Sequence, residues 1–270
     1  MSELGNAEPA KLAELRGSSS PRLINRIAVV TGASRGLGKF FAEILAREGA
    51  HVILAARSSK LQDVAESIQR SGGISHYVEL DVARDDSVAL AFERIISQWG
   101  CPSIVVNNAG ITEMIATLDQ KPSSFDRILA TNLRGPWIVA REAAKHMVAN
   151  KVPGSIVNIA SILALRQAGR VTAYAVTKSA VVQLTKQLAL EWARYGIRVN
   201  ALAPGYVETD LNREFFANEK GQEMIRRIPM RRLTRMEDLA EPLMLLAGDG
   251  GGFITGIVLP VDGGHLLSSL

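Results

Sequence analysis

The chain has 270 residues, of which 47% are hydrophobic, and a net charge of +4. This size suits a large α/β domain, and so small a charge surplus does not indicate nucleic-acid binding. The single cysteine excludes an intrachain disulfide and a cysteine metal cluster, and no apolar run reaches the about 18 residues that cross a bilayer. We therefore expect a cytoplasmic protein with no metal site, and surface or capping roles for the scattered histidines His51, His76, His146 and His265.

Residues 1–22 are polar and end in Gly-Ser-Ser-Ser-Pro-Arg, which predicts a flexible N-terminal extension. From residue 23 to 270, short apolar runs alternate with amphipathic stretches. The apolar runs predict buried strands at 27–30, 51–55, 77–80, 103–106, 155–159, 197–202 and 257–261. Helices are expected from a glycine-rich turn to about 48, at 59–70, 87–99, 124–150, from Tyr174 to about 195, and from 236.

Strands that alternate with helices and are apolar on both faces predict an α/β fold of Rossmann type, with a doubly wound seven-stranded parallel sheet. Neither a repeat nor a Pro-rich linker divides the chain, so we expect a single domain. Residues 206–236 interrupt the alternation. We interpret this stretch as a helical lid over the substrate.

The first predicted strand leads into Gly32-Ala-Ser-Arg-Gly36-Leu-Gly38, which opens the first helix. Glycines allow a tight turn and let the backbone approach a pyrophosphate, which the helix N-terminus favours. The spacing differs from Gly-x-Gly-x-x-Gly, but the strand–turn–helix context favours dinucleotide binding.

The end of the second predicted strand indicates which dinucleotide is bound. NAD sites usually have an acidic residue there, whereas arginine suits the additional phosphate of NADP. This chain has Arg57 and no acid, and Arg35 adds a positive charge in the glycine turn. We expect NADP(H), with NAD(H) still possible; the alternative for Arg57 is a solvated residue at a helix start.

Tyr174 and Lys178 are four residues apart on a predicted helix, which places them on one face about 6 Å apart along the axis. Tyrosine has a pKa of about 10, which a nearby ammonium lowers. The pair is therefore expected to exchange a proton with an alcohol or carbonyl oxygen near neutral pH. Ser161 follows a predicted strand, so its hydroxyl could meet the same oxygen. The alternative is an ordinary surface pair.

Taken together, residues 24–265 resemble the short-chain dehydrogenase/reductase family, most closely its 3-oxoacyl reductase and gluconate 5-dehydrogenase branches. The matching stretches are Thr31–Gly38, Asp81, Asn107–Gly110, Asn132, Ser161, Tyr174 with Lys178, Pro204-Gly205 with Thr209, and Val261–Gly264. The chain departs from the family at 229–234, Pro-Met-Arg-Arg-Leu-Thr, where two glycines are often found.

The resemblance implies a catalytic role for four residues. Tyr174 would be the general acid in reduction and the base in oxidation, and Lys178 would lower its pKa and hold the nicotinamide ribose. Ser161 would hydrogen-bond the substrate oxygen, and Asn132 would order a water linked to Lys178. The candidate cofactor residues are Gly32, Ser34, Arg35, Gly36, Leu37, Gly38, Arg57, Asp81, Val82, Asn108, Ala109, Gly110, Tyr174, Lys178, Pro204, Gly205, Val207 and Thr209.

The family also implies a homotetramer, or a homodimer, formed through the helices at 124–150 and 174–195. Arginines in the lid, with Arg166 or Arg170, suggest an anionic substrate; a solvated or ion-paired face is the alternative. For the activity we favour a NADPH-dependent ketoreductase or the reverse alcohol dehydrogenase. Non-redox chemistry on the same fold and a non-catalytic NADP-binding protein stay open.

Overall fold

The protein is seen here as a computed structural model that describes residues 21–208 and 213–268. Within these residues one sheet has seven strands, all parallel, in the order β3-β2-β1-β4-β5-β6-β7. The chain builds outward from β1 in one direction and from β4 in the other, so the predicted doubly wound sheet is confirmed. The strands are β1 Ile27–Thr31, β2 His51–Ala56, β3 Ile74–Glu79, β4 Ile104–Asn107, β5 Gly154–Ile159, β6 Ile197–Pro204 and β7 Val258–Val261.

Helices connect successive strands. The predicted helix 124–150 is two α-helices joined by a five-residue π-helix, η2, that contains Asn132. The α-helices are α2 Gly36–Arg47, α3 Leu61–Arg70, α4 Asp85–Trp99, α5 Pro122–Leu129, α6 Gly135–Ala149, α7 Thr172–Trp192, α8 Arg213–Ala217, α9 Glu219–Arg227 and α10 Ala240–Ala247. The shorter helices are η1 Thr117–Asp119, η2 Ala130–Arg134, η3 Ile162–Ala164, η4 Ala193–Tyr195, η5 Met236–Leu239, η6 Asp249–Gly251 and η7 His265–Leu267.

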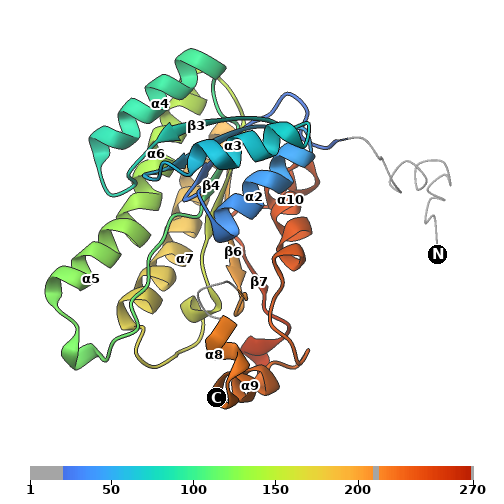
Figure 1. The fold of residues 1–270 in the computed structure, drawn as a ribbon. Helices are drawn as coiled ribbons and strands as arrows, with labels where there is room; N and C mark the ends of the chain where they lie inside the picture. The colour runs from blue at the N-terminus through green and yellow to red at the C-terminus, as the bar shows by residue number, and fades with distance from the viewer. Residues whose placement is uncertain (1–20, 209–212, 269–270) are drawn as a thin grey trace, which may run out of the picture.

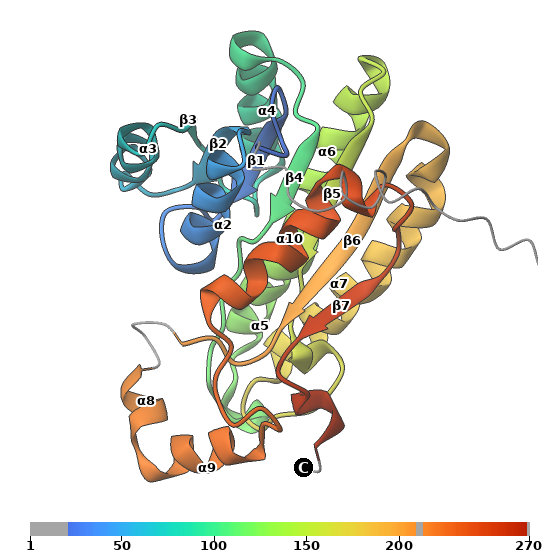
Figure 2. The ribbon, with the colours of Figure 1, turned by 90° about the vertical axis from the view of Figure 1, so that its right-hand side faces the viewer.

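Two helical layers cover the sheet. Helices α2, α3 and α10 pack on one face, and α4, α6 and α7 pack on the other (Figures 1 and 2). Adjacent strand residues point to opposite layers: Val30 belongs to the first core and Val29 to the second, and both are fully buried. Burial of each such side chain stabilises the fold by about 1.5–3 kcal/mol. This double burial explains why the strands are continuous apolar runs.

The carboxyl ends of the strands lie at one edge of the sheet. Helices α8 and α9 lie below the ends of β6 and β7 in Figure 1, beside the last described residues of the chain. In a doubly wound sheet this edge is where ligands bind. The topology therefore brings the segments that follow β1, β2, β4, β5, β6 and β7 to one place.

Most of the predicted N-terminal extension, residues 1–20, lies outside the described residues. Its last residue, Arg22, is already tied to the body of the protein. The Arg22 guanidinium forms ion pairs with Glu48 and Glu241, each at 2.8 Å. Leu23 is fully buried in the core below it, so the fold begins by Arg22.

Candidate active site

Tyr174, Lys178 and Ser161 meet at the carboxyl end of β5. Tyr174 and Lys178 are one turn apart near the start of α7, and Ser161 precedes the short helix η3. The Ser161 side chain lies close enough to the Tyr174 hydroxyl to act on its pKa. Lys178 Nζ lies 5.5 Å from the centroid of the Tyr174 ring. The fold therefore brings together the three side chains that the sequence singled out.

Lys178 is held in place by the end of the strand. It is buried, and its Nζ donates a hydrogen bond of 2.6 Å to the carbonyl oxygen of Ile159, the last residue of β5. A Cβ added at Gly110, after β4, would lie 3.7 Å from Nζ. The ammonium group thus lies between the ends of two neighbouring strands.

Burial acts on both titratable groups of this site. It raises the pKa of Tyr174, against the opposing effect of the Ser161 hydrogen bond, and it lowers the pKa of Lys178 to about 8. The expectation that Lys178 lowers the pKa of Tyr174 is therefore wrong for the protein alone, because desolvation disfavours phenolate and ammonium alike. Lys178 is the group that loses its proton first as the pH rises.

Asn132 is fully buried in the π-helix η2. Its side-chain oxygen accepts the N–H of Ile111 at 2.8 Å, and its amide donates to the Ile111 carbonyl at 2.8 Å and to Thr177 Oγ1 at 3.3 Å. Asn132 therefore links the segment after β4 to the start of α7. A Cβ at Gly110 would lie 3.5 Å from Asn132 Oδ1, so Asn132 borders the same space as Lys178. Short π-helical bulges inside α-helices are frequent at functional sites.

The glycine turn forms a cradle at the start of α2. Gly32 and Gly36 have φ of +65° and +56°. A Cβ at Gly38 would lie 2.3 Å from the Gly32 carbonyl oxygen, so only glycine allows helix and turn to pack this closely. The cap residue of α2, Arg35, makes no side-chain capping bond, and the first turn has no acidic residue. Its backbone N–H groups are therefore free of side-chain caps, which fits a bound pyrophosphate.

Thr31 and Asn108 hold this turn against β4. The Asn108 amide donates to the carbonyl oxygens of Thr31 and Gly32 at 3.0 and 3.3 Å. Thr31 Oγ1 accepts the N–H groups of Asn108 and Ala109, both at 3.1 Å. Asn108 thus positions the glycine turn with its side chain. The motif alone assigned Thr31 no separate role, although its place directly before the first glycine was a usable signal.

The candidate adenosine residues lie at the ends of β2 and β3. Arg57 is exposed, and its Nη1 lies 3.8 Å from Asp81 Oδ2. Asp81 also accepts the N–H of Ala83 at 3.0 Å, so its carboxylate stabilises its own turn. The Val82 side chain is buried in the core, which leaves mainly its backbone for a ligand. Arg35 is exposed at the start of α2.

Pro204 and Gly205 form the junction between β6 and β7. Pro204, the last residue of β6, is paired with Val261, and the Gly205 N–H donates to the Val261 carbonyl at 2.9 Å. A Cβ at Gly205 would lie 2.9 Å from Asp262 Cα, so the close approach of the two segments requires glycine here.

The stretch predicted to form a lid begins directly after this junction. Val207 is buried and forms a parallel bridge with Thr234, which closes the segment at its base. Helices α8 and α9 lie between these two residues, and Phe216 of α8 is buried. Thr209, a candidate cofactor residue, lies outside the described residues.

Comparison with known proteins agrees with this geometry. The family model described as Enoyl-(Acyl carrier protein) reductase matches residues 32–265. Cis-4-hydroxycyclohexanecarboxylate dehydrogenase of Sinomonas cyclohexanicum is 37% identical over 241 residues, which are 89% of this chain and 96% of that protein. The chain belongs to the short-chain dehydrogenase/reductase family.

Two further relatives are similar over nearly their whole length. The 3-oxoacyl-(acyl-carrier-protein) reductase of Pseudomonas aeruginosa is 37% identical, over 91% of this chain and 99% of its own. A gluconate 5-dehydrogenase from Burkholderia cenocepacia, solved in complex with NADP and tartrate, has a TM-score of 0.88 and 34% identity, over 92% of this chain and 98% of its own. These similarities make this short-chain dehydrogenase/reductase an oxidoreductase acting on CH–OH or C=O groups.

Several arginines in the predicted lid of this short-chain dehydrogenase/reductase are engaged locally. Arg231 has φ of +56°, at a position of the stretch that lacks the family's glycines, and its guanidinium donates to the carbonyl of Arg226 in the last turn of α9. Such engagement supports the ion-paired alternative for much of the cluster. Three of these arginines form ion pairs: Arg213 with Glu208 and Arg227 with Glu223, each at 3.0 Å, and Arg232 with Asp238 at 2.5 Å.

His265 is not a surface or capping residue, so that expectation is wrong. It follows β7, and its side chain is only 4% exposed. Its ring centroid lies 5.3 Å from that of Tyr206, which in turn lies 5.9 Å from that of Phe216. The available signal was its position directly after Val261-Asp-Gly-Gly264, at the carboxyl end of the last strand.

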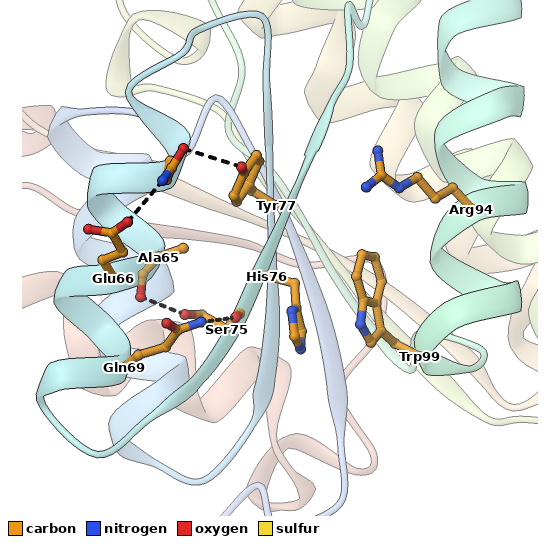
Figure 3. Close-up of a pocket in the computed structure, with 9 residues that line it drawn as sticks. Ala65, Glu66, Gln69, Ser75, His76, Tyr77, Arg94 and Trp99 are labelled. Carbon is orange, nitrogen blue, oxygen red and sulfur yellow. Dashed lines mark hydrogen bonds between the residues drawn. The ribbon is translucent and has the colours of Figure 1, made fainter.

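A separate cavity of about 300 Å³ lies along the edge strand β3, between α3 and α4. Figure 3 shows Tyr77 directed toward α3 and His76 toward Trp99 of α4, on which its ring stacks at a centroid distance of 4.7 Å. Three strands separate β3 from β5. This cavity is therefore not part of the Tyr174 site.

The described part of the chain offers little for other kinds of site. There, no group of three or more His, Cys, Asp or Glu side chains could hold a metal ion. Over the same residues no helix is both long enough and apolar enough to cross a membrane. Burial raises the pKa of the Cys101 thiol, which makes it a poor nucleophile.

Proposed function

We propose that the protein is an NADP(H)-dependent oxidoreductase that reduces a ketone to a secondary alcohol, or catalyses the reverse reaction, with Tyr174 as general acid and base. The contact of Tyr174 with Ser161, beside the buried Lys178, carries this proposal. It places a phenol, an alcohol and an ammonium at the edge of the sheet where the cofactor cradle also lies.

The nicotinamide, when bound, supplies or accepts the hydride. In reduction the Tyr174 phenol donates its proton to the substrate oxygen, and the Ser161 hydroxyl donates a hydrogen bond to the same atom. Lys178 then returns a proton to Tyr174, and Asn132 shapes the space beside it. In oxidation the proton moves the other way.

The cofactor would extend from the glycine cradle to Lys178. The first turn of α2 would hold the pyrophosphate and Lys178 the nicotinamide ribose. Arg35 and Arg57 are exposed where β1 and β2 end, which supports NADP(H) because arginine can bind a phosphate bidentately. The residues proposed to line this path are Gly32, Ser34, Gly36, Leu37, Gly38, Asp81, Val82, Asn108, Ala109, Gly110, Pro204, Gly205, Val207 and Thr209.

The direct test follows nicotinamide absorbance over a panel of ketones. We would offer NADPH or NADH with 4-oxocyclohexanecarboxylate, a keto-gluconate, a β-keto thioester and cyclohexanone. We expect turnover with NADPH and at least one ketone. Preference for NADH would contradict the roles of Arg35 and Arg57. Tight NADPH binding without turnover would favour non-redox chemistry or a binding role.

The pH dependence should follow Lys178, whose pKa is lowered to about 8. Below that pH the ammonium can resupply Tyr174, so ketone reduction should be level and then fall as the pH rises through about 8. Alcohol oxidation needs the pair to accept a proton and should rise over the same range. Profiles of kcat/KM against pH test this. A Lys178→Met control should lose the inflection, and reduction that speeds up above pH 8 would contradict the assignment.

An anionic substrate is also part of the proposal. One relative is named for a cyclohexanecarboxylate, and a solved relative holds tartrate. In this chain Arg166 is half-buried and follows η3, five residues after Ser161, whereas Arg170 is exposed. Arg166 is therefore the better placed of the two arginines to meet a negative group.

We also infer a homotetramer or homodimer in the cytoplasm. The face formed by α5, α6 and α7 has an apolar hollow of about 470 Å³, which a second copy could cover. A solution mass of two or four chains supports this, and a monomeric mass overturns it. The hollow is lined by Asp126, Leu129, Ala130, Leu133, Arg134, Trp137 and Leu184.

A further inference from the structure

Three segments that follow neighbouring strands meet beneath the lid. Tyr206 follows β6, His265 follows β7, and Arg166 follows β5 and η3. The rings of Tyr206 and His265 are 5.3 Å apart, and Arg166 Nη1 donates to the His265 carbonyl at 2.5 Å. These residues belong to the carboxyl edge of the sheet, as Ser161 and Tyr174 do.

His265 has an unused hydrogen-bonding atom inside this cluster. The side chain is 4% exposed, and its Nδ1 is buried without a hydrogen-bond partner among residues 21–208 and 213–268. Buried polar atoms are almost always paired, so an orphaned one requires an explanation. A ligand that enters beneath the lid could supply the missing acceptor.

The charges around His265 favour a negative ligand. Burial and the positive charges of Arg166 and Arg227 lower the pKa of His265, whereas Asp262 acts in the opposite direction. The Asp262 carboxylate is already used: its two oxygens accept the N–H groups of Gly264 and Leu266 at 2.9 and 2.7 Å. Because Arg227 is also ion-paired with Glu223, Arg166 is the cation beside His265 that has no carboxylate partner among the described residues, and it favours a negative ligand.

We propose that His265 Nδ1 and the Tyr206 hydroxyl bind a carboxylate of the substrate beside Arg166. This rests on the proposed ketone or alcohol chemistry at Tyr174. The imidazole tautomer with its proton on Nδ1 donates to one carboxylate oxygen, and the phenol of Tyr206 donates to the other. A substrate lacking the carboxylate leaves these buried donors unpaired and is rejected.

The distance between this cluster and the reacting oxygen sets the substrate class. Ser161 and Arg166 are joined by the compact helix η3, in which Ala164 N–H donates to the Ser161 carbonyl and Arg166 N–H to that of Ile162. The substrate is therefore a keto or hydroxy acid whose carboxylate extends from the reacting carbon to this cluster.

Calorimetric binding of cyclohexanecarboxylate and of its neutral carboxamide, measured without cofactor in Tyr174→Phe protein, tests this independently of turnover. His265→Phe keeps the ring beside Tyr206 but removes Nδ1, whereas His265→Asn restores a polar atom near its position. Tyr206→Phe removes only the hydroxyl. The matched control is His146→Phe, in the last turn of α6.

We expect protein with His265 intact to bind the carboxylate more tightly than the carboxamide. His265→Phe should weaken carboxylate binding about tenfold or more, His265→Asn should recover most of it, and Tyr206→Phe should cost about fivefold. Carboxamide binding and the control should change less than about twofold.

Equal binding of the two ligands, or an undiminished affinity of His265→Phe for the carboxylate, would overturn the proposal. If His265→Phe does not fold, the carboxylate affinities of Tyr206→Phe and His265→Asn replace it. An unchanged affinity in Tyr206→Phe would then overturn the proposal. Turnover that survives Tyr174→Phe would instead refute the proposed function alone.

Discussion

Tyr174→Phe is expected to lower kcat for ketone reduction by about a thousandfold, because it removes the only proposed proton donor to the substrate oxygen. The phenylalanine ring fills the same space on α7, so packing is kept. NADPH affinity should change by less than about twofold, since Lys178 keeps its 2.6 Å bond to the Ile159 carbonyl. Steady-state kinetics and a fluorescence titration of NADPH measure the two effects.

The control for this change is Tyr195→Phe, on the exposed helix η4 far from the carboxyl end of β5. This variant also removes a tyrosine hydroxyl, but it should leave the rate of ketone reduction unchanged. If Tyr174→Phe keeps more than about a tenth of the wild-type kcat, the proton comes from another group. Loss of NADPH binding together with the rate would show that Tyr174 is needed for the cofactor site rather than for proton transfer.

Alanine substitutions in the glycine turn are expected to separate folding from cofactor binding. At Gly38 a Cβ would lie 2.3 Å from the Gly32 carbonyl oxygen and 2.5 Å from Asn108 Nδ2. Helix α2 would have to move away from the turn, so Gly38→Ala should lower the free energy of unfolding by about 3 kcal/mol. At Gly36 no described residue lies within 4 Å of a Cβ, and φ is +56°. Gly36→Ala should therefore cost only about 1 kcal/mol of stability.

The open space at Gly36 is where the pyrophosphate is proposed to lie. Gly36→Ala should thus weaken NADPH binding about tenfold or more despite its small effect on folding. Gly72→Ala is the matched control, because Gly72 also has positive φ and an open Cβ position but lies after α3. Urea unfolding and NADPH titration measure both quantities. Normal NADPH affinity in Gly36→Ala would remove the glycine turn from the cofactor path.

The pattern of the sequence was sufficient for the architecture. Two helical layers cover the sheet, so its central strands β1, β2, β4, β5 and β6 are apolar on both faces. This pattern can be recognised from the residues of each strand alone. The glycine turn and the Tyr174–Lys178 spacing are likewise short-range signals. The predicted seven strands, their parallel arrangement and the meeting of Ser161, Tyr174 and Lys178 all depend on such signals.

Other properties of the site arise only when distant segments pack together. Whether the pKa of Tyr174 is raised or lowered depends on burial of the site. The spacing of Tyr174 and Lys178 in the sequence carries no information on this burial. Asn132 lies in a π-helix, and its side chain links Ile111 to Thr177. His265 is buried beside Tyr206 and beside Arg166, which lies 99 positions earlier in the chain. Local periodicity sets the secondary structure, whereas burial, charge pairing and pKa come from contacts between residues far apart in the sequence.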